Sequence, residues 1–166
     1  GPSMQAADID ATVINERRID MGLVPGPGPL AAARVKHITL PGTITVPLNL
    51  EMAAVDEMVQ IAVKTRPRQV SLVPEKRQEI TTEGGLDVVR HKKELAATIG
   101  KLQDAGIVVS LFIDPDPVQI ETAASLLVPA VELHTGAYAN AGKNAHKELH
   151  LLAQAATFVH QAGLIL

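Results

Sequence analysis

The order of apolar and polar positions from about residue 46 to the C-terminus predicts alternating strands and helices. Short runs rich in valine, isoleucine and leucine alternate with longer segments in which apolar residues recur at helical spacing. The predicted strands are residues 46–50, 69–73, 107–113, 130–134 and 164–166, and the predicted helices lie near residues 54–65, 86–104, 117–127 and 144–162. Because the connections are short, this order is typical of right-handed βαβ units in a mostly parallel sheet.

The predicted helices each carry one apolar face. Residues 86–104 place four apolar side chains on the same side of a helix, namely Val88, Leu95, Ile99 and Leu102. The predicted strands are almost continuously apolar, as expected for a parallel sheet covered by helices. Gly106 and Gly163 each stand between a helix and a strand, where a left-handed C-cap is expected.

The first 45 residues give a less regular pattern. Ile9, Val13 and Arg17 fall at helical spacing, whereas residues 8–10 are also compatible with a first strand. Residues 35–40 and 43–46 are β-branched and alternating, and Pro41-Gly42 between them is a turn signal. A parallel connection needs a dozen or more residues, so this stretch predicts a β-hairpin.

The predicted domain organisation follows from these patterns. Residues 1–4 (GPSM) are interpreted as the scar of a cleaved tag and excluded from the fold. Residues 5–45 form a divergent N-terminal segment with the hairpin, and residues 46–166 form the βα-repeat region, within one domain of residues 5–166. The predicted fold class is α/β, either a partial TIM-type (β/α) barrel or an open, mostly parallel sheet with an altered N-terminal hairpin.

Composition limits the size of the fold and the class of partner. The 166 residues, 46% apolar and 20% charged, suffice for one domain with a core but fall short of the roughly 250 residues of a complete eightfold barrel. A net charge of −3 and 2% aromatic residues argue against nucleic-acid binding. No apolar run reaches the length of a membrane span and no signal peptide is recognisable, so a cytoplasmic protein without membrane partners is expected.

Charged and polar residues gather where the first and second of these strands end. Glu51, Glu75, Lys76, Arg77 and Thr81 are expected to lie on one rim, because loops after the carboxyl ends of parallel strands carry the chemistry in such folds. Glu51 ends a predicted buried strand, where desolvation raises the pKa of a carboxyl group and suits it to proton transfer near neutral pH. The alternative is a structural ion pair between Glu51 and Lys76 or Arg77.

Glu132 and His134 are separated by one residue on a predicted strand, so both side chains are expected on the same face. On the inner face of a barrel, two such polar groups need hydrogen-bonding partners or a ligand. The sequence leaves open whether they form a satisfied core pair or part of a binding site.

Two further groups were weighed as ligand sites. His146 and His150 lie four residues apart on a predicted helix and could share a metal ion, but no third ligand is evident and no metal site is predicted. Gly84-Gly85 precede a predicted helix start and could offer backbone amides to a phosphate, but a lone glycine pair is weak evidence and a tight turn is the favoured explanation.

Five segments resemble one enzyme family. They are residues 48–53 (LNLEMA), 72–79 (LVPEKRQE), 81–88 (TTEGGLDV), 109–114 (VSLFID) and 132–136 (ELHTG). Together they resemble the pyridoxine 5′-phosphate synthase family, TIM-barrel enzymes of vitamin B6 synthesis. The resemblance runs from about Val46 to the C-terminus, roughly three quarters of the chain.

The resemblance implies a reaction and residues that carry it. The family condenses 3-amino-2-oxopropyl phosphate with 1-deoxy-D-xylulose 5-phosphate and needs no cofactor. Glu51 matches its catalytic glutamate, Glu132 the glutamate that stabilises the transition state, and Thr81 a residue that binds the deoxyxylulose phosphate. Residues 8–11 (DIDA) take the place of an Asn-x-Asp-His pattern, so Asp10 matches a substrate-binding aspartate while the asparagine and histidine are replaced.

Other parts of that family's site have no counterpart here. The family uses a general-base histidine and a neighbouring arginine after its second strand, a donor histidine after the seventh, and phosphate-binding glycines after the seventh and eighth. This sequence stops at residue 166 within the predicted seventh strand. The chain is therefore interpreted as an engineered, truncated and inactive fragment with a structural or self-assembly role, because losing several catalytic groups costs many powers of ten in rate.

The alternative is a working pyridoxine 5′-phosphate synthase that binds its phosphosugar through Glu51, Thr81 and Glu132. A small phosphorylated ligand is then expected. In either case an open barrel would expose apolar surface and unpaired strand edges, so a homo-oligomer is predicted.

Overall fold

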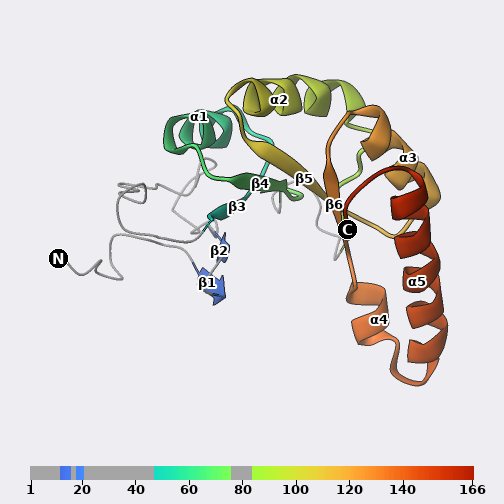
Figure 1. Ribbon diagram of the computed structural model, residues 1–166. Helices are drawn as coiled ribbons and strands as arrows, with labels where there is room; N and C mark the ends of the chain where they lie inside the picture. Colours follow the sequence, from blue (N-terminus) through green and yellow to red (C-terminus); the bar gives the residue numbers. More distant parts are fainter. Residues whose placement is uncertain (1–11, 16–17, 21–46, 76–83) are drawn as a thin grey trace.

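The computed structural model describes residues 12–15, 18–20, 47–75 and 84–166. Its six strands form one sheet in the order β1-β2-β3-β4-β5-β6, in which β1 and β2 are antiparallel and all later neighbours are parallel. The strands are β1 Thr12–Asn15, β2 Arg18–Asp20, β3 Asn49–Met52, β4 Gln69–Leu72, β5 Val108–Ile113 and β6 Ala130–Leu133. The helices are α1 Asp56–Thr65, α2 Lys92–Asp104, α3 Pro117–Ser125, α4 Gly136–Asn140 and α5 Ala145–Gln161, with a 3-10 turn at Gly142–Asn144. The predicted α/β class with a mostly parallel sheet is confirmed, and the described arc is compatible with a partial barrel (Figure 1).

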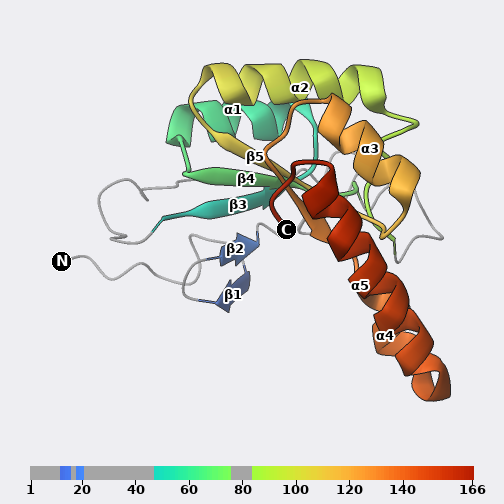
Figure 2. The ribbon, with the colours of Figure 1, turned by 45° about the vertical axis from the view of Figure 1, so that its right-hand side comes forward.

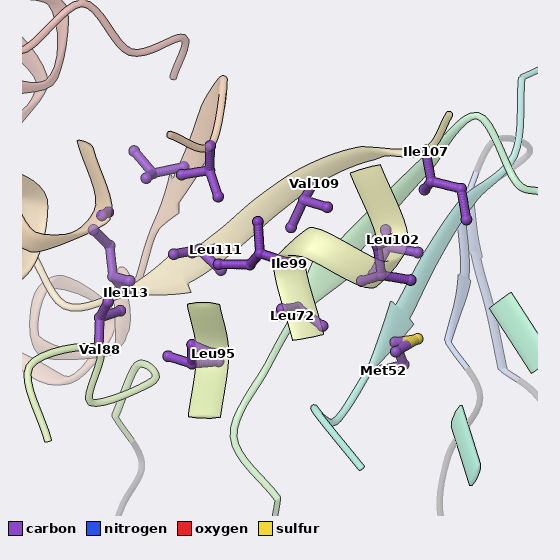
Figure 3. Packing of buried hydrophobic residues seen from close by; sticks show 14 of the residues in the cluster. Met52, Leu72, Val88, Leu95, Ile99, Leu102, Ile107, Val109, Leu111 and Ile113 are labelled. Carbon is purple, nitrogen blue, oxygen red and sulfur yellow. The ribbon is translucent and has the colours of Figure 1, made fainter. Parts of the chain in front are cut away.

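The outer face of the sheet is apolar and lies under the helices (Figures 1 and 2). Register partners on parallel strands point to the same face, so Leu50 and Val70 lie side by side, as do Val70 and Val109. All three are at most 2% exposed. Helices α1 and α2 close this layer with Met58, Val59, Ala62, Leu95, Ile99 and Leu102. Figure 3 labels the three residues from α2, which are Leu95, Ile99 and Leu102. This sheet-to-helix layer is the core of the described fold.

The inner face of the sheet is polar, which corrects the expectation of continuously apolar strands. Glu51 pairs in register with Ser71, and Ser71 with Ser110, so the three side chains form one row. On β3 and β4 the residues on the inner face are polar, whereas on β5 Ser110 lies between the apolar Val108 and Phe112 on that face. In the described part of the chain the helices lie on one side of the sheet, which leaves the opposite side for polar groups (Figures 1 and 2).

Two elements depart most from their predicted bounds. The strand expected at residues 46–50 is Asn49–Met52, because Pro47 has no N–H to donate to a ladder, and Glu51 consequently lies within the strand rather than at its end. The helix expected from residue 86 begins at Lys92, because the Gln119 side chain accepts hydrogen bonds from the backbone of residues 88 and 89. The intervening residues form turns, although Val88 is fully buried as predicted.

Helix ends follow local sequence signals. Asp116 caps α3 by accepting hydrogen bonds from the N–H groups of residues 118 and 119, and Pro117 takes the first helical position. Gly106 and Gly163 both adopt a φ of +79°, which confirms the predicted left-handed caps. These caps fix the lengths of the loops that lead into β5 and out of α5.

The ends of the chain depart from the predictions. The predicted hairpin of residues 35–46 lies outside the described residues, as do residues 1–4. An antiparallel pair occurs instead at β1 and β2, so the helical alternative at Val13 is wrong. The last predicted strand, residues 164–166, is a single bridge in which Ile165 pairs with Ala130 of β6. Helix α4 and the 3-10 turn were not predicted, since no apolar period marks them.

Candidate active site

A polar row crosses the inner face from β3 to β6. The hydroxyl of Ser71 donates a hydrogen bond to Glu132 Oε1 and accepts one from Asn49 Nδ2 at 3.0 Å. Glu132 belongs to β6 and Ser71 to β4, so this bond passes over β5 beside the small side chain of Ser110. Glu51, the register partner of Ser71, is only 6% exposed. The two glutamates singled out from the sequence therefore share one face: Ser71 donates a hydrogen bond to Glu132 and is the register partner of Glu51.

The hydrogen bond from Ser71 fixes the direction of the Glu132 carboxylate. A hydrogen bond from a hydroxyl group to a carboxylate is stronger than one to a neutral acceptor. Ser71 is fully buried and Ser110 is 1% exposed, so the arrangement is sheltered from solvent. Within the described residues the Ser110 hydroxyl has no hydrogen-bond partner. The row thus combines one well-anchored carboxylate with one buried carboxylate, the combination needed for proton transfer and charge stabilisation.

A second polar cluster lies where β5 and β6 end. Asp114 directly follows β5, and its Oδ1 lies 3.2 Å from His134 Nδ1 and accepts a hydrogen bond from the Gly85 N–H at 2.8 Å. The His134 ring meets the Phe112 ring edge-on at a centroid distance of 5.3 Å. Phe112 is also the register partner of Glu132, so the prediction that Glu132 and His134 share a face is confirmed. In the described part of the chain, Glu132 accepts a hydrogen bond from Ser71, and His134 Nδ1 lies against the Asp114 carboxylate.

The predicted rim is described only in part. Glu75 lines a cavity of about 230 Å³ between the end of β4 and the start of α2, together with Asp87, His91 and Glu94; Glu51 is absent from its lining. Lys76, Arg77, Thr81 and Asp10 lie outside the described residues, and so do the predicted ion-pair partners of Glu51.

Asp87 beside this cavity is firmly hydrogen-bonded. The Gln119 side-chain amide donates to its Oδ1 at 3.0 Å and the Arg90 N–H at 3.1 Å. These two bonds, with smaller contributions from the charges of His91 and Arg90, lower the pKa of Asp87 below its usual range against an opposing effect of burial. The carboxylate therefore fixes the turn that leads into α2.

The remaining candidates are placed as follows. His146 and His150 are exposed on α5, and the described residues provide no group of three metal-binding side chains around them. The Gly85 N–H donates to Asp114, and a Cβ at Gly85 would lie 2.3 Å from the Asp114 backbone nitrogen. The structure therefore supports the tight-turn interpretation of Gly84-Gly85, in which the absence of a side chain permits close packing.

Comparison with known proteins identifies the family. The sequence model described as "Pyridoxal phosphate biosynthesis protein PdxJ" matches residues 34–166. The chain belongs to the PdxJ family. The matched range includes residues 34–46, most of which belong to the predicted hairpin.

The similar proteins compared with this PdxJ-family chain are all named pyridoxine 5′-phosphate synthase. A pyridoxine 5′-phosphate synthase from Gluconobacter oxydans is 59% identical over 121 residues, which cover 73% of this chain and 51% of the relative. The one from Akkermansia muciniphila is 50% identical over 123 residues, which cover 74% of this chain and 50% of the relative. The one from Bradyrhizobium diazoefficiens is 57% identical over 109 residues, which cover 66% of this chain and 44% of the relative. The chain spans about half the length of the curated relatives it matches.

Three residues of the candidate site escaped prediction from the sequence. Ser71, Ser110 and Asp114 were treated as parts of strands or their ends, although a lone serine in each of two apolar strands signals a polar inner face. Asp114 follows β5 directly, the same signal by which Glu51 was selected. No helix in the described part of the chain has the length and apolar character of a membrane span, and the predicted cytoplasmic location stays a prediction.

Proposed function

We propose that this chain carries part of a pyridoxine 5′-phosphate synthase site, the part that contains Glu51 and Glu132. The enzyme condenses 3-amino-2-oxopropyl phosphate with 1-deoxy-D-xylulose 5-phosphate. The observation that supports it most directly is the placement of Glu51 and Glu132 on one inner face, where Ser71 is the register partner of Glu51 and donates a hydrogen bond to Glu132. The names of the similar proteins support the same reaction.

Each carboxylate has a role that its surroundings favour. Glu51 is buried among strands, and a desolvated carboxyl group exchanges protons near neutral pH more readily than an exposed one. Glu132 is half-buried and held by the Ser71 hydroxyl, so it presents a fixed negative charge that stabilises positive charge developing on the substrate. By the resemblance of the sequence, Thr81 and Asp10 bind the phosphorylated substrates.

The decisive experiment is an assay with the two phosphorylated substrates. Product is followed by mass spectrometry for the unmodified chain, for Glu51→Gln, and for Glu57→Gln as a matched control on the exposed first turn of α1. Glu51→Gln is expected to lower the rate by about 10²–10⁴-fold, the usual contribution of one general acid or base. Glu57→Gln should match the parent. Equal rates for parent and Glu51→Gln, or no product from the parent, would refute the proposal.

A second candidate is a folded, inactive chain with a structural or self-assembly role. It is favoured by apolar side chains on the first half of α5, where Leu149 is 50% and Leu151 is 42% exposed, and by Ile165 at 65% near the C-terminus. Apolar surface of this kind is removed from water when copies associate. Light scattering at tens of micromolar tests it: a homo-oligomer that Leu149→Glu converts to a smaller species supports this role, and a well-behaved monomer contradicts it.

A further inference from the structure

Asp114 and His134 form an aspartate–histidine pair at the carboxyl edge of the sheet. Asp114 directly follows β5 and His134 directly follows β6, and these two strands are parallel neighbours. The Asp114 Oδ1 lies 3.2 Å from His134 Nδ1 and also accepts the Gly85 N–H at 2.8 Å, so the carboxylate has a fixed direction. Folds with a parallel sheet carry their chemistry at this edge.

The pairing leaves the second nitrogen of the His134 ring available. A carboxylate beside Nδ1 selects the tautomer with a proton on that nitrogen, so Nε2 is a proton acceptor. Within the part of the chain that the structure describes, Nε2 has no hydrogen-bonding partner. The side chain is 20% exposed, so the ring is sheltered from solvent without being enclosed. An imidazole held by a carboxylate at one nitrogen and unoccupied at the other has the arrangement of a general base.

Phe112 and Gly136 shape the space around the imidazole ring. The Phe112 ring meets it edge-on at a centroid distance of 5.3 Å. At Gly136 an added Cβ would lie 2.6 Å from both Cε1 and Nε2 of the histidine. A side chain at position 136 would therefore occupy the space beside Nε2, and glycine keeps that space open.

Glu132 lies two residues before His134 on the same face of the sheet, and Ser71 fixes the direction of its carboxylate. Positions two residues apart on a strand are separated by roughly 7 Å, so both side chains are placed to act on one small molecule. Joining an amino ketone to a second ketone and closing a ring removes protons from carbon and nitrogen and releases water. Such a reaction needs several groups that exchange protons.

We propose that His134 is a general base of the condensation and that Asp114 is its positioning residue. This inference rests on the proposed function. Nε2 takes the proton from the hydroxyl-bearing carbon beside the ketone of 1-deoxy-D-xylulose 5-phosphate. The C–H bond breaks, and its electron pair forms the C=C bond of an enolate with the negative charge on the former carbonyl oxygen.

The proton on Nε2 is then returned to the substrate. The Asp114 carboxylate stabilises the imidazolium while it carries the proton. The imidazolium gives the proton to the hydroxyl group on the next carbon, and this group leaves as water. The enolate electrons restore the ketone and form a C=C bond beside it, so the substrate loses one water molecule and His134 ends unchanged.

The experiment separates a proton-accepting role from a structural one. His134→Asn keeps an N–H near the position of Nδ1 for Asp114 but has no basic nitrogen. Asp114→Asn keeps an oxygen for the histidine and for the Gly85 N–H but removes the negative charge. Gly136→Ala places a methyl group beside Nε2. His150→Asn is the matched control, because His150 is exposed on α5.

Steady-state kinetics give the first expected result. His134→Asn should lower kcat by about 10²–10⁴-fold, the usual contribution of one general base, with the KM for the deoxyxylulose phosphate within about threefold. Asp114→Asn should lower kcat about tenfold, the difference between a hydrogen bond to a charged and to a neutral group. Gly136→Ala should lower kcat in the parent and have no further effect when combined with His134→Asn. His150→Asn should match the parent.

Two further measurements do not depend on turnover. In D2O, the parent incubated with 1-deoxy-D-xylulose 5-phosphate alone should place deuterium on the carbon beside the ketone, and His134→Asn should not. Diethyl pyrocarbonate reacts with neutral imidazole nitrogens, and peptide mapping by mass spectrometry should show faster modification of His134 in the parent than in Gly136→Ala.

The other outcomes are equally informative. Parental kcat and deuterium incorporation in His134→Asn would show that the histidine only supports Asp114, which overturns the inference and leaves the proposed function intact. A raised KM with unchanged kcat would also overturn it, because the ring would then only bind the substrate. If His134→Asn does not fold, Asp114→Asn and Gly136→Ala decide the matter through kcat and deuterium incorporation. Absence of both product and deuterium incorporation with the parent would refute the proposed function, and the inference with it.

Discussion

Removing the Ser71 hydroxyl tests whether the link across the inner face is a real constraint. Ser71→Ala deprives the Glu132 carboxylate of a donor and the Asn49 amide of an acceptor at 3.0 Å. A hydrogen bond to a charged group contributes about 1.5–3 kcal/mol, and Ser71 is fully buried, so no water replaces the lost partner without rearrangement. We expect the free energy of unfolding to fall by about 2–3 kcal/mol.

Ser110→Ala is the matched control in the next strand. Its hydroxyl is as buried as that of Ser71 but has no hydrogen-bond partner within the described residues. Removing an unsatisfied buried hydroxyl leaves stability unchanged or raises it by about 1 kcal/mol. The two substitutions are chemically identical, lie in register on adjacent strands, and are expected to have opposite or at least clearly different effects.

Urea unfolding followed by circular dichroism measures the free energy of unfolding of both variants, and thermal unfolding measures their melting temperatures. For a chain of this size, a loss of about 2–3 kcal/mol lowers the melting temperature by about 5–10 °C. Equal destabilisation of Ser71→Ala and Ser110→Ala would show that the hydrogen-bond network contributes little and that only packing matters. In the substrate assay, Ser71→Ala should also lower kcat, since Glu132 loses its fixed orientation.

Two further predictions concern the connection before α2. Gly85→Ala should destabilise the chain by about 3 kcal/mol or more, because the new Cβ would meet the Asp114 backbone at 2.3 Å. Gly100→Ala adds a Cβ with no atom within 4 Å and should stabilise α2 by about 0.5–1 kcal/mol. Thermal unfolding compares the stabilities of the two variants. Asp87 has a pKa lowered from 3.8 by Gln119 and the Arg90 N–H, so its stabilising effect is present above pH 3.8 and is lost as the pH falls through the lowered value. The stability difference between the parent and Asp87→Asn should therefore shrink in urea titrations below pH 3.8, and a constant difference would contradict this.

Much of the fold was predictable because its signals are local. The apolar period of α2, the proline before β3 and the glycines after two helices are properties of short segments. The exact start of α2 was not predictable, because Gln119, about 30 residues away, binds the amides of residues 88 and 89. Helix α4 is five residues long and buries none of them, so no hydrophobic pattern announces it.

The site was predictable in its charges and not in its connections. Glu51 and Glu132 stand out because carboxylates in apolar strands are rare. The hydrogen bond from Ser71 to Glu132 depends on the register of β4, β5 and β6, which no local pattern encodes. Likewise, the pairing of Asp114 with His134 needs β5 and β6 to be neighbours.

The alternation along β4 makes this strand intolerant of changes in length. Val70 and Leu72 are enclosed by helices, and Ser71 between them serves the opposite side. Inserting one residue before Ser71 would move every later side chain of β4 to the opposite face. The serine hydroxyl would then lie in the apolar core under the helices, and Leu72 would lie on the polar inner face. Evolution of this chain can therefore exchange residues in β4 one at a time, but insertions and deletions must be confined to the loops on either side.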